Sequence, residues 1–186
     1  MVEESPTTPI RDYALIGDCH GAALVSKTAG IHWFTPFRFD GDPVFFKLLD
    51  KERGGAWEVE VEGLRRIGRA YLPRTNILRT CFETDTGRLD VLDFMPVGRT
   101  MDAGVHDYVS LAAPGWLVRR FECREGRVRA RMRLSPRGQD FALQAPGIEI
   151  GPHGVEFGTG STLWCDAGMR PDPEGDGVEG VFELGE

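Results

Sequence analysis

Residues 10–50, IRDYALIGDCHGAALVSKTAGIHWFTPFRFDGDPVFFKLLD, carry the clearest structural signal in the chain. Two strand-like runs, residues 13–16 and 22–25, are separated by a polar break, and a turn ending at Gly30 leads into a third run at residues 31–34. Gly30 can adopt the positive φ that a tight hairpin requires. The sequence therefore predicts that the second and third runs pair as an antiparallel hairpin.

An aromatic and charged loop, residues 36–41, follows the hairpin and leads into a predicted short helix. Asp42 is a suitable N-cap, Pro43 suits the first helical position, and the glycines at positions 54 and 55 end the helix. One face of this helix is apolar, with Val44, Phe45, Leu48 and Leu49. Because Phe46 and the loop phenylalanines add to this apolar surface, we expect the segment to lie against something large.

The rest of the chain alternates between strand signals and turn signals. Residues 56–62 place Trp57, Val59 and Val61 on one face and glutamates on the other, which is the period-two pattern of a half-buried strand. Residues 124–126 are interpreted as a hairpin turn. Further strand-like runs are residues 65–72, 77–84, 89–95, 116–123, 127–134, 148–150, 155–157, 163–165 and 178–184. This pattern predicts a mainly β chain, an antiparallel two-sheet, supersandwich-like β-sandwich with one short helix.

Length and charge limit the classes of function. The 186 residues suffice for one domain with a substantial core. With 41% hydrophobic and 27% charged residues, the composition indicates a folded, soluble protein, and no apolar run is long enough to span a membrane. The formal net charge of −7 argues against nucleic-acid or anionic-membrane partners, because these require surplus basic surface. We expect neither partner and no cofactor.

The cysteines and the start of the chain indicate a cellular compartment. Cys19, Cys81, Cys123 and Cys165 are widely spaced and form no C-x-x-C pair, so no zinc site is expected. The N-terminus has acidic residues and no long apolar core, unlike a secretory signal. We therefore expect reduced thiols in a cytoplasmic protein. Residues 1–9 are expected to be a flexible lead-in and residues 10–186 a single domain.

The loop at residues 36–41 holds candidate binding residues: Arg38, Asp40, Phe37, Phe39 and, shortly before it, Trp33. Aromatic side chains can cover the apolar faces of sugars while arginine and carboxylate groups bond to hydroxyls. These residues are therefore candidates for substrate binding or for docking another domain. The alternative is an Arg38–Asp40 ion pair that holds the loop, with the phenylalanines in the core. We favour this alternative.

Asp18, His20 and His32 could form a metal or proton-transfer cluster. Their spacing fixes no third partner, however, so a turn-capping aspartate and a partly exposed histidine are expected. No metal is assigned. A compact enzyme built around Asp18 and His20 is the least favoured hypothesis.

Two other patterns also have a plain structural interpretation. The arginines at positions 127, 129, 131 and 133 form a basic stripe that matches the glutamates at positions 58, 60 and 62, so pairing on a solvated sheet face is expected. Each tryptophan lies in or beside an alternating run, so burial in the core is favoured over a sugar platform. The tryptophans are Trp33, Trp57, Trp116 and Trp164.

Several blocks of sequence, taken in order, resemble the N-terminal domain of bacterial and archaeal glucoamylase and trehalase-like enzymes of glycoside hydrolase family 15. The blocks are YALIGDCHGAALVS, GIHW, PFRFDGDPVFFKLL, YLPRTNIL, CFETDTGRLDVLDFMPV and LVRRFECREGRVRARMRLSPRGQDFAL. They cover most of residues 10–143. The chain departs from the family pattern at His32, where an acidic residue usually precedes the tryptophan, and at Gly41 followed by a second acid, Asp42.

The resemblance implies a β-sandwich that precedes a helical (α/α) barrel, which hydrolyses α-glucosidic bonds of trehalose or α-glucans with inversion. The family's two catalytic glutamates belong to that barrel, which would begin beyond Glu186. We therefore expect no catalytic residue in this chain, no activity from the isolated chain, and an end near the last strand of the sandwich. The implied partners are the helical catalytic domain, in cis or in trans, and an α-glucoside ligand. The alternative is a free-standing carbohydrate-binding or protein-interaction module.

Overall fold

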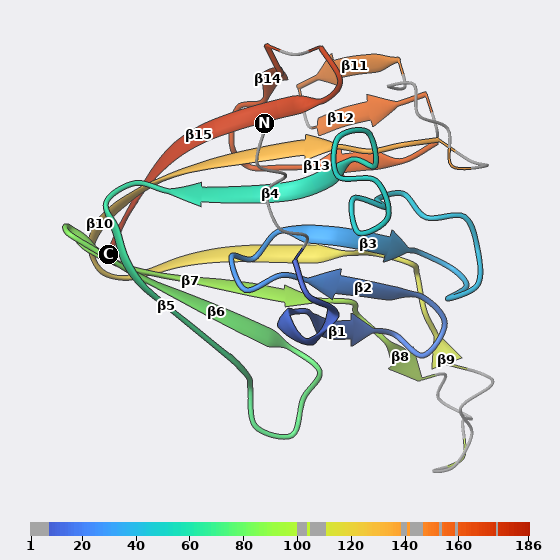
Figure 1. Ribbon diagram of the computed structural model, residues 1–186, viewed down its shortest axis with the longest axis horizontal. Helices are drawn as coiled ribbons and strands as arrows, with labels where there is room; N and C mark the ends of the chain where they lie inside the picture. The colour runs from blue at the N-terminus through green and yellow to red at the C-terminus, as the bar shows by residue number, and fades with distance from the viewer. Residues whose placement is uncertain are drawn as a thin grey trace, which may run out of the picture.

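The computed structural model describes residues 8–99, 104, 111–138, 141, 147–152, 154–158, 160–173 and 175–186. These residues form two main antiparallel sheets, which confirms the predicted mainly β, two-sheet fold (Figure 1). The first sheet has the order β1 (Ala14–Gly17), β2 (Ala22–Val25), β3 (Ile31–Thr35), β4 (Ala56–Val61), β10 (Val118–Ser135), β15 (Val178–Gly185) and β14 (Arg170–Pro171). The second has the order β10, β7 (Gly87–Phe94), β6 (Leu78–Thr84) and β5 (Leu64–Tyr71).

Two smaller antiparallel sheets accompany the main ones. One contains β11 (Ile148–Gly151), β12 (Gly154–Phe157) and β13 (Thr162–Trp164), and the other pairs β8 (Gly98–Arg99) with β9 (Leu111–Ala112). Within the described residues, the helical structure is limited to the 3-10 turn η1 (Ile10–Asp12).

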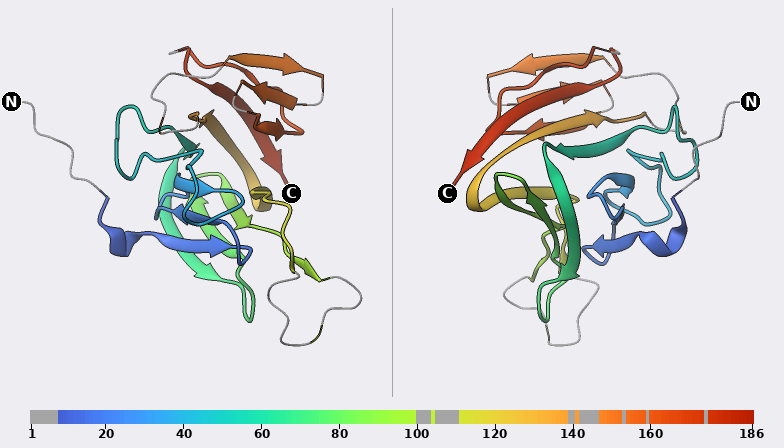
Figure 2. Two further views of the ribbon diagram at one scale, coloured as in Figure 1. Left: turned by 90° about the vertical axis from the view of Figure 1, so that its right-hand side faces the viewer. Right: turned by 60° about the vertical axis from the view of Figure 1, so that its left-hand side comes forward.

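The long strand β10 belongs to both main sheets. Its first half pairs with β7, and its second half pairs with β4 on one side and β15 on the other. The predicted hairpin turn at residues 124–126 is therefore wrong: the strand continues through a bulge between Cys123 and Glu125 and bends from one sheet into the other (Figure 2). Gly126 makes this bend possible, because its φ is +66° and a Cβ there would overlap the carbonyl oxygen of Thr86.

The core lies between the sheets. The second half of β10 alternates as predicted, with Val128, Ala130, Met132 and Leu134 buried and the arginines on the opposite face. One apolar cluster joins β10 residues with Phe82 of β6 and with Leu89 and Val91 of β7. A larger cluster joins the first sheet with Leu78 of β6 and with the small sheet, through Val155, Phe157 and Leu163. Both sheets therefore bury one face against a shared interior.

The helix predicted to begin at Asp42 is wrong. Phe45 instead forms an isolated antiparallel bridge with Phe34, and turns follow. Phe45 and Phe46 are adjacent and both are buried, with Phe45 against Phe34 and Phe46 against Phe141. Extended backbone sends neighbouring side chains in opposite directions, so it can bury both rings in different places. Phe45 and Phe46 thus pack this segment against the rest of the domain, as expected.

The predicted hairpin of β2 and β3 is confirmed by antiparallel pairing between Ala22 and Thr35 and between Leu24 and Trp33. The predicted role of Gly30 is wrong, because Ala29 carries the positive φ, 61°. Gly30 is required for a different reason: a Cβ there would overlap the Glu58 carboxylate and lie 2.6 Å from His32 Nε2. The glycine makes room for a partly buried polar pair, His32 and Glu58.

Candidate functional site

Three loops meet at one end of the first sheet, which we call the loop end: residues 17–21, 36–41 and 113–116. The close approach of their backbones requires glycine, since a Cβ on Gly21 would overlap the Thr35 carbonyl oxygen and one on Gly115 would lie 2.5 Å from Phe37 Cε1. Gly115 also has a positive φ of 70°. In Figure 1, β1 and β3 finish, and β2 and β10 begin, on this same side.

Exposed aromatic side chains gather at the loop end. Phe37 is 67% exposed, Phe39 74%, Trp116 55% and Trp164 67%. The two indole rings meet edge to face, with centroids 6.1 Å apart. Beside Trp116 runs an open apolar groove lined by Pro96, Val97, Gly98, Ala112, Ala113 and Pro114. Large aromatic side chains rarely stay this exposed in a contiguous group without a binding role.

The structure confirms one part of the favoured interpretation of the loop at residues 36–41 and contradicts the other. Arg38 does pair with Asp40 through two hydrogen bonds, Nε to Oδ1 at 3.0 Å and Nη2 to Oδ2 at 2.8 Å, and this pairing lowers the pKa of Asp40. The expectation that Phe37 and Phe39 lie in the core is wrong, because both rings are exposed. Trp33 is half-buried on β3. A binding or docking role for these residues stays a prediction.

The prediction that the tryptophans are buried is also only partly correct. Trp57 is buried, as expected, whereas the expected burial of Trp116 and Trp164 is wrong. Trp116 lies just before β10, and Trp164 is the last residue of the short strand β13, so both lie at strand ends. Alternation in sequence identified the strands but could not show where they end.

Asp18 caps the turn after β1, as predicted. Its Oδ1 accepts hydrogen bonds from the backbone N–H groups of His20, at 3.0 Å, and Gly21, at 2.7 Å. The side chain is fully buried, yet Oδ2 has no hydrogen-bond partner within the described chain, nor has the buried Nδ1 of His20. Between them, Cys19 has a φ of +74°, which is strained for a residue other than glycine. Backbone strain of this kind is concentrated at functional sites, which makes the turn a candidate for one.

His32 does not join Asp18 and His20 in a cluster of three, because both its ring nitrogens are engaged elsewhere. Nδ1 lies 2.7 Å from the Tyr13 hydroxyl and Nε2 lies 3.0 Å from Glu58 Oε1. Lys47 donates to the same carboxylate oxygen at 2.5 Å. Burial alone would raise the pKa of Glu58, but His32 and Lys47 lower it to about 2. His32 therefore joins Tyr13, Glu58 and Lys47 in a half-buried polar network.

The arginine stripe on β10 is paired with acids, as predicted for Glu60 and Glu62, whereas the pairing expected for Glu58 is wrong because Glu58 contacts His32 and Lys47. Arg131 contacts Glu60 and Arg129 contacts Glu62 across β4, each at 3.8 Å. On the other side of β10, the sequence did not indicate the acids that pair with the stripe. The buried Glu179 of β15 accepts hydrogen bonds from Arg131 of the stripe and from Arg170. The stripe is therefore a neutralised face.

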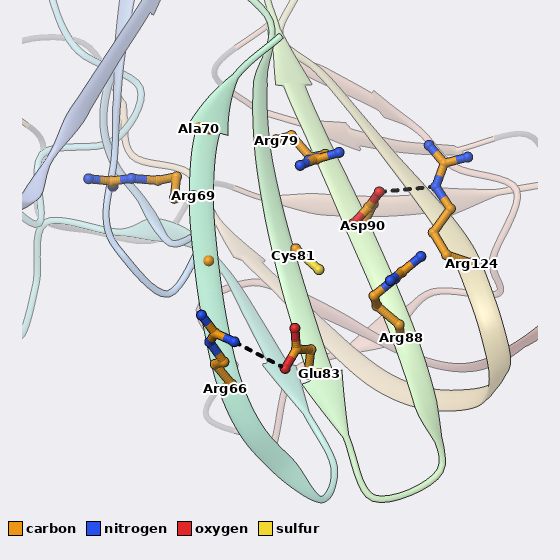
Figure 3. A pocket seen from close by; sticks show the side chains of 10 residues that line it. Arg66, Arg69, Ala70, Arg79, Cys81, Glu83, Arg88, Asp90 and Arg124 are labelled. Atoms are coloured by element: carbon orange, nitrogen blue, oxygen red, sulfur yellow. Dashed lines mark hydrogen bonds and ion pairs between the residues drawn. The ribbon is translucent and has the colours of Figure 1, made fainter.

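A second concave surface lies on the outer face of β5, β6 and β7 and beside the bulge of β10, and we call it the arginine hollow (Figure 3). Its floor is made of small side chains, and its walls are the arginines at positions 66, 79, 88 and 124 with Glu83 and Asp90. The sequence analysis did not identify it, because its residues come from four strands. Only the register of those strands brings them together.

Three further findings concern the described residues. No group of three or more His, Cys, Asp or Glu side chains there could hold a metal ion. No helix in that part of the chain is long and apolar enough to cross a membrane. All four cysteines are free thiols.

The fold and the loop end define a class of protein: a two-sheet antiparallel β domain with exposed aromatic side chains at one end. Comparison with protein families places it more closely. The chain belongs to the family described as "Trehalase-like, N-terminal", whose profile matches residues 2–157. The trehalase side of the resemblance seen in the sequence is thus confirmed.

The chain is similar to part of several longer proteins. A trehalase of Mycolicibacterium smegmatis is 32% identical over 158 residues, covering 80% of this chain and 23% of that protein. A trehalase of Mycobacterium tuberculosis is 31% identical over 189 residues, covering 92% and 27% respectively. Trehalase 2 of Sulfolobus acidocaldarius is 36% identical over 86 residues, covering 46% and 14%. The chain spans about a quarter of the length of the mycobacterial relatives. No solved structure matches it significantly.

Proposed function

We propose that this chain is the non-catalytic N-terminal domain of a glycoside hydrolase of family 15, and that it supports a helical (α/α) barrel which hydrolyses the α-glucosidic bond of trehalose or of α-glucans. Three of its relatives are trehalases, and the chain corresponds to about a quarter of the two mycobacterial proteins. The observation that carries the proposal is the loop end, with its exposed Trp116 and Trp164 and the groove beside them.

The loop end has the composition of an interface. Aromatic residues in the centre of a patch contribute most of the binding free energy in protein contacts, and Trp116, Trp164 and Phe37 supply them here. Covering this end would remove apolar surface from water.

The carboxyl groups argue against hydrolysis by this chain alone. An inverting glycosidase needs a carboxylic acid whose pKa is raised, placed about 6.5–9.5 Å from a carboxylate base. Among the described residues, every carboxyl group with a displaced pKa is displaced downward: Asp12, Asp40, Asp50, Glu58, Asp176 and Glu179. Their partners, mostly arginine and lysine, stabilise the charged form, which is a poor proton donor.

The test is glucose release by two preparations, the 186-residue chain and the full-length gene product. We expect the full-length product to release glucose from trehalose or from maltooligosaccharides and the 186-residue chain to release none. If the full-length product leaves both substrates intact, the proposed activity is wrong. Cleavage by the 186-residue chain would refute its non-catalytic role.

The docking role is tested in the full-length product with the W116A/W164A variant. Losing two central aromatic contacts should weaken the interface by about 2 kcal/mol or more, which would show as faster thermal inactivation. Leu64→Ala is the control, because Leu64 is also exposed, at 44%, but lies on β5 outside the loop end. Equal inactivation rates for W116A/W164A and the unmodified protein would contradict docking through these rings.

A carbohydrate-binding module is the second candidate, favoured by the same exposed indole pair. Indole rings can stack on the apolar faces of glucose units, as they can pack against a protein. Calorimetric titration of the 186-residue chain with trehalose, maltose and maltotriose distinguishes the two functions. Heat that disappears in W116A/W164A would favour the module, and flat traces for all three sugars would rule it out.

We also propose a cytoplasmic location. The four free thiols are compatible with a reducing compartment, where disulfides are rare. Fractionation of the native cells, followed by immunodetection of the chain, would test this location directly.

A further inference from the structure

The arginine hollow has the size and shape of a small-ligand site. Its volume is about 570 Å³, within the range of ligand pockets. The floor is low because Gly68 and Ala70 of β5 lie beside Cys81 and Arg79 of β6, so small side chains occupy the middle of the sheet face. Burial, with the neighbouring Asp90, raises the pKa of the Cys81 thiol, so Cys81 adds no negative charge to the floor at neutral pH.

Two of the four arginine side chains in the walls are already neutralised. Arg124 Nε lies 3.0 Å from Oδ2 of Asp90, whose carboxylate is buried. Arg66 Nη1 lies 4.0 Å from Glu83 Oε2. A fifth arginine contributes to the lining but directs its guanidinium elsewhere: Arg69 donates to the carbonyl oxygens of Asp12 and Val25. Figure 3 shows Arg69 turned away from the hollow.

Arg79 and Arg88 differ from the other arginines of the hollow in their partners. Within the described residues, neither side chain makes an ion pair or a hydrogen bond, although 22 basic residues in this protein face 29 acidic ones. They come from adjacent strands, β6 and β7, on either side of Cys81 and Asp90 (Figure 3). In a chain with a net charge of −7, two unpaired guanidinium groups remain here after Asp90 pairs with Arg124 and Glu83 with Arg66, and they form a local positive surface.

We propose that the arginine hollow binds a small, doubly charged oxyanion, either free or carried on a sugar, through Arg79 and Arg88. Two positive charges left over by the internal ion pairs match a dianion, and each planar guanidinium can donate two parallel hydrogen bonds to neighbouring oxygens of a phosphate-like group. The open floor beside Gly68 leaves room for the rest of an esterified ligand. The site lies on the second sheet and does not depend on the function proposed for the loop end.

The experiment is calorimetric titration of the 186-residue chain at low ionic strength with inorganic phosphate, glucose 6-phosphate and glucose. The R79Q/R88Q variant removes both unpaired guanidinium groups. The matched control is R127Q/R129Q, which removes two positive charges from exposed arginines on the first sheet, outside the hollow. Circular dichroism checks that each variant is folded, and amide chemical shifts of Gly68 and Ala70 report binding at the floor.

We expect at least one of the two anions to bind, glucose not to bind, and R79Q/R88Q to weaken the affinity at least tenfold, while R127Q/R129Q changes it less than twofold. Equal affinity for phosphate and glucose 6-phosphate would identify a free-anion site, and binding of the ester alone would identify a phosphosugar site. Absence of binding by both anions, or full affinity in R79Q/R88Q, would overturn the proposal.

Discussion

Arg119 contacts both sheets from inside the core. It forms an ion pair with Asp93 of β7, Nε to Oδ1 at 2.7 Å, and both side chains are fully buried. Its other nitrogens donate to the carbonyl oxygens of Trp57, at 3.2 Å, and Ala29, at 2.5 Å, and its guanidinium lies 5.0 Å from the centroid of the Trp57 ring. One side chain of the second sheet thus satisfies backbone groups of the first.

We predict that Arg119→Met lowers the free energy of unfolding by about 3–5 kcal/mol, because it leaves the Asp93 carboxylate buried without a partner. Adding Asp93→Leu should recover much of this loss, since the unpaired charge is then removed. Urea denaturation measures both effects. The control Arg127→Met breaks only the exposed pair with Glu183 and should cost about 0–1 kcal/mol. If Arg119→Met lowers the free energy of unfolding no more than the control does, the buried pair contributes little to stability.

Glu58 makes stability depend on acidity. Its pKa is about 2 in the folded chain and 4.5 ordinarily, so the folded state holds the charged form more strongly than the unfolded state does. For a carboxyl group with a lowered pKa, this stabilisation is complete above the ordinary value and is lost as the pH falls from 4.5 toward 2. Its size is about 3 kcal/mol, from roughly 1.4 kcal/mol per pKa unit.

We therefore predict that Glu58→Gln destabilises the chain at pH 7 and that the difference from the unmodified chain shrinks by about 2–3 kcal/mol between pH 5 and pH 2.5. Urea unfolding at several pH values measures it. Glu62→Gln is the control, because Glu62 is exposed and lies 3.8 Å from Arg129. A difference between Glu58→Gln and the unmodified chain that stays constant with pH would contradict the assignment of the network.

The bend in β10 depends on Gly126. We predict that Gly126→Ala lowers the free energy of unfolding by more than about 1–2 kcal/mol, because the left-handed backbone disfavours a Cβ and the added methyl group overlaps the Thr86 carbonyl oxygen. Gly68→Ala is the matched control in a strand of the same sheet: nothing lies within 4 Å of a Cβ there. Its stability should change by less than about 0.5 kcal/mol. Similar unfolding midpoints for both variants would disprove the special role of Gly126.

The bend also explains why one element was misread. Arg124, Glu125 and Gly126 have the composition of a turn, and a bulge uses the same residue types as a turn. What separates them is the partner strand, since β7 stays paired up to Gly126 and β15 begins its pairing at Arg127. The helix expected at Asp42 failed similarly: local propensity favoured it, but burial of Phe45 and Phe46 prevailed.

Across the whole chain, alternation predicted what belongs to single strands and missed what several strands make together. The strand pattern, the buried face of β10 and the capping role of Asp18 follow from neighbours in sequence, and all are confirmed. The arginine hollow, the Arg119–Asp93 pair and the exposure of Trp116 and Trp164 depend on strand register and on strand ends. The spacing of residues within one segment does not determine the register between strands or the positions of strand ends.

Because β10 supplies hydrogen bonds to both sheets, neither layer keeps a complete set of backbone partners once the other has separated. Heat or mechanical load applied to one layer is therefore transmitted to the other, and the described domain should lose its structure in one cooperative step without a half-melted intermediate. A support built this way would present its loop end to a neighbouring domain intact or not at all.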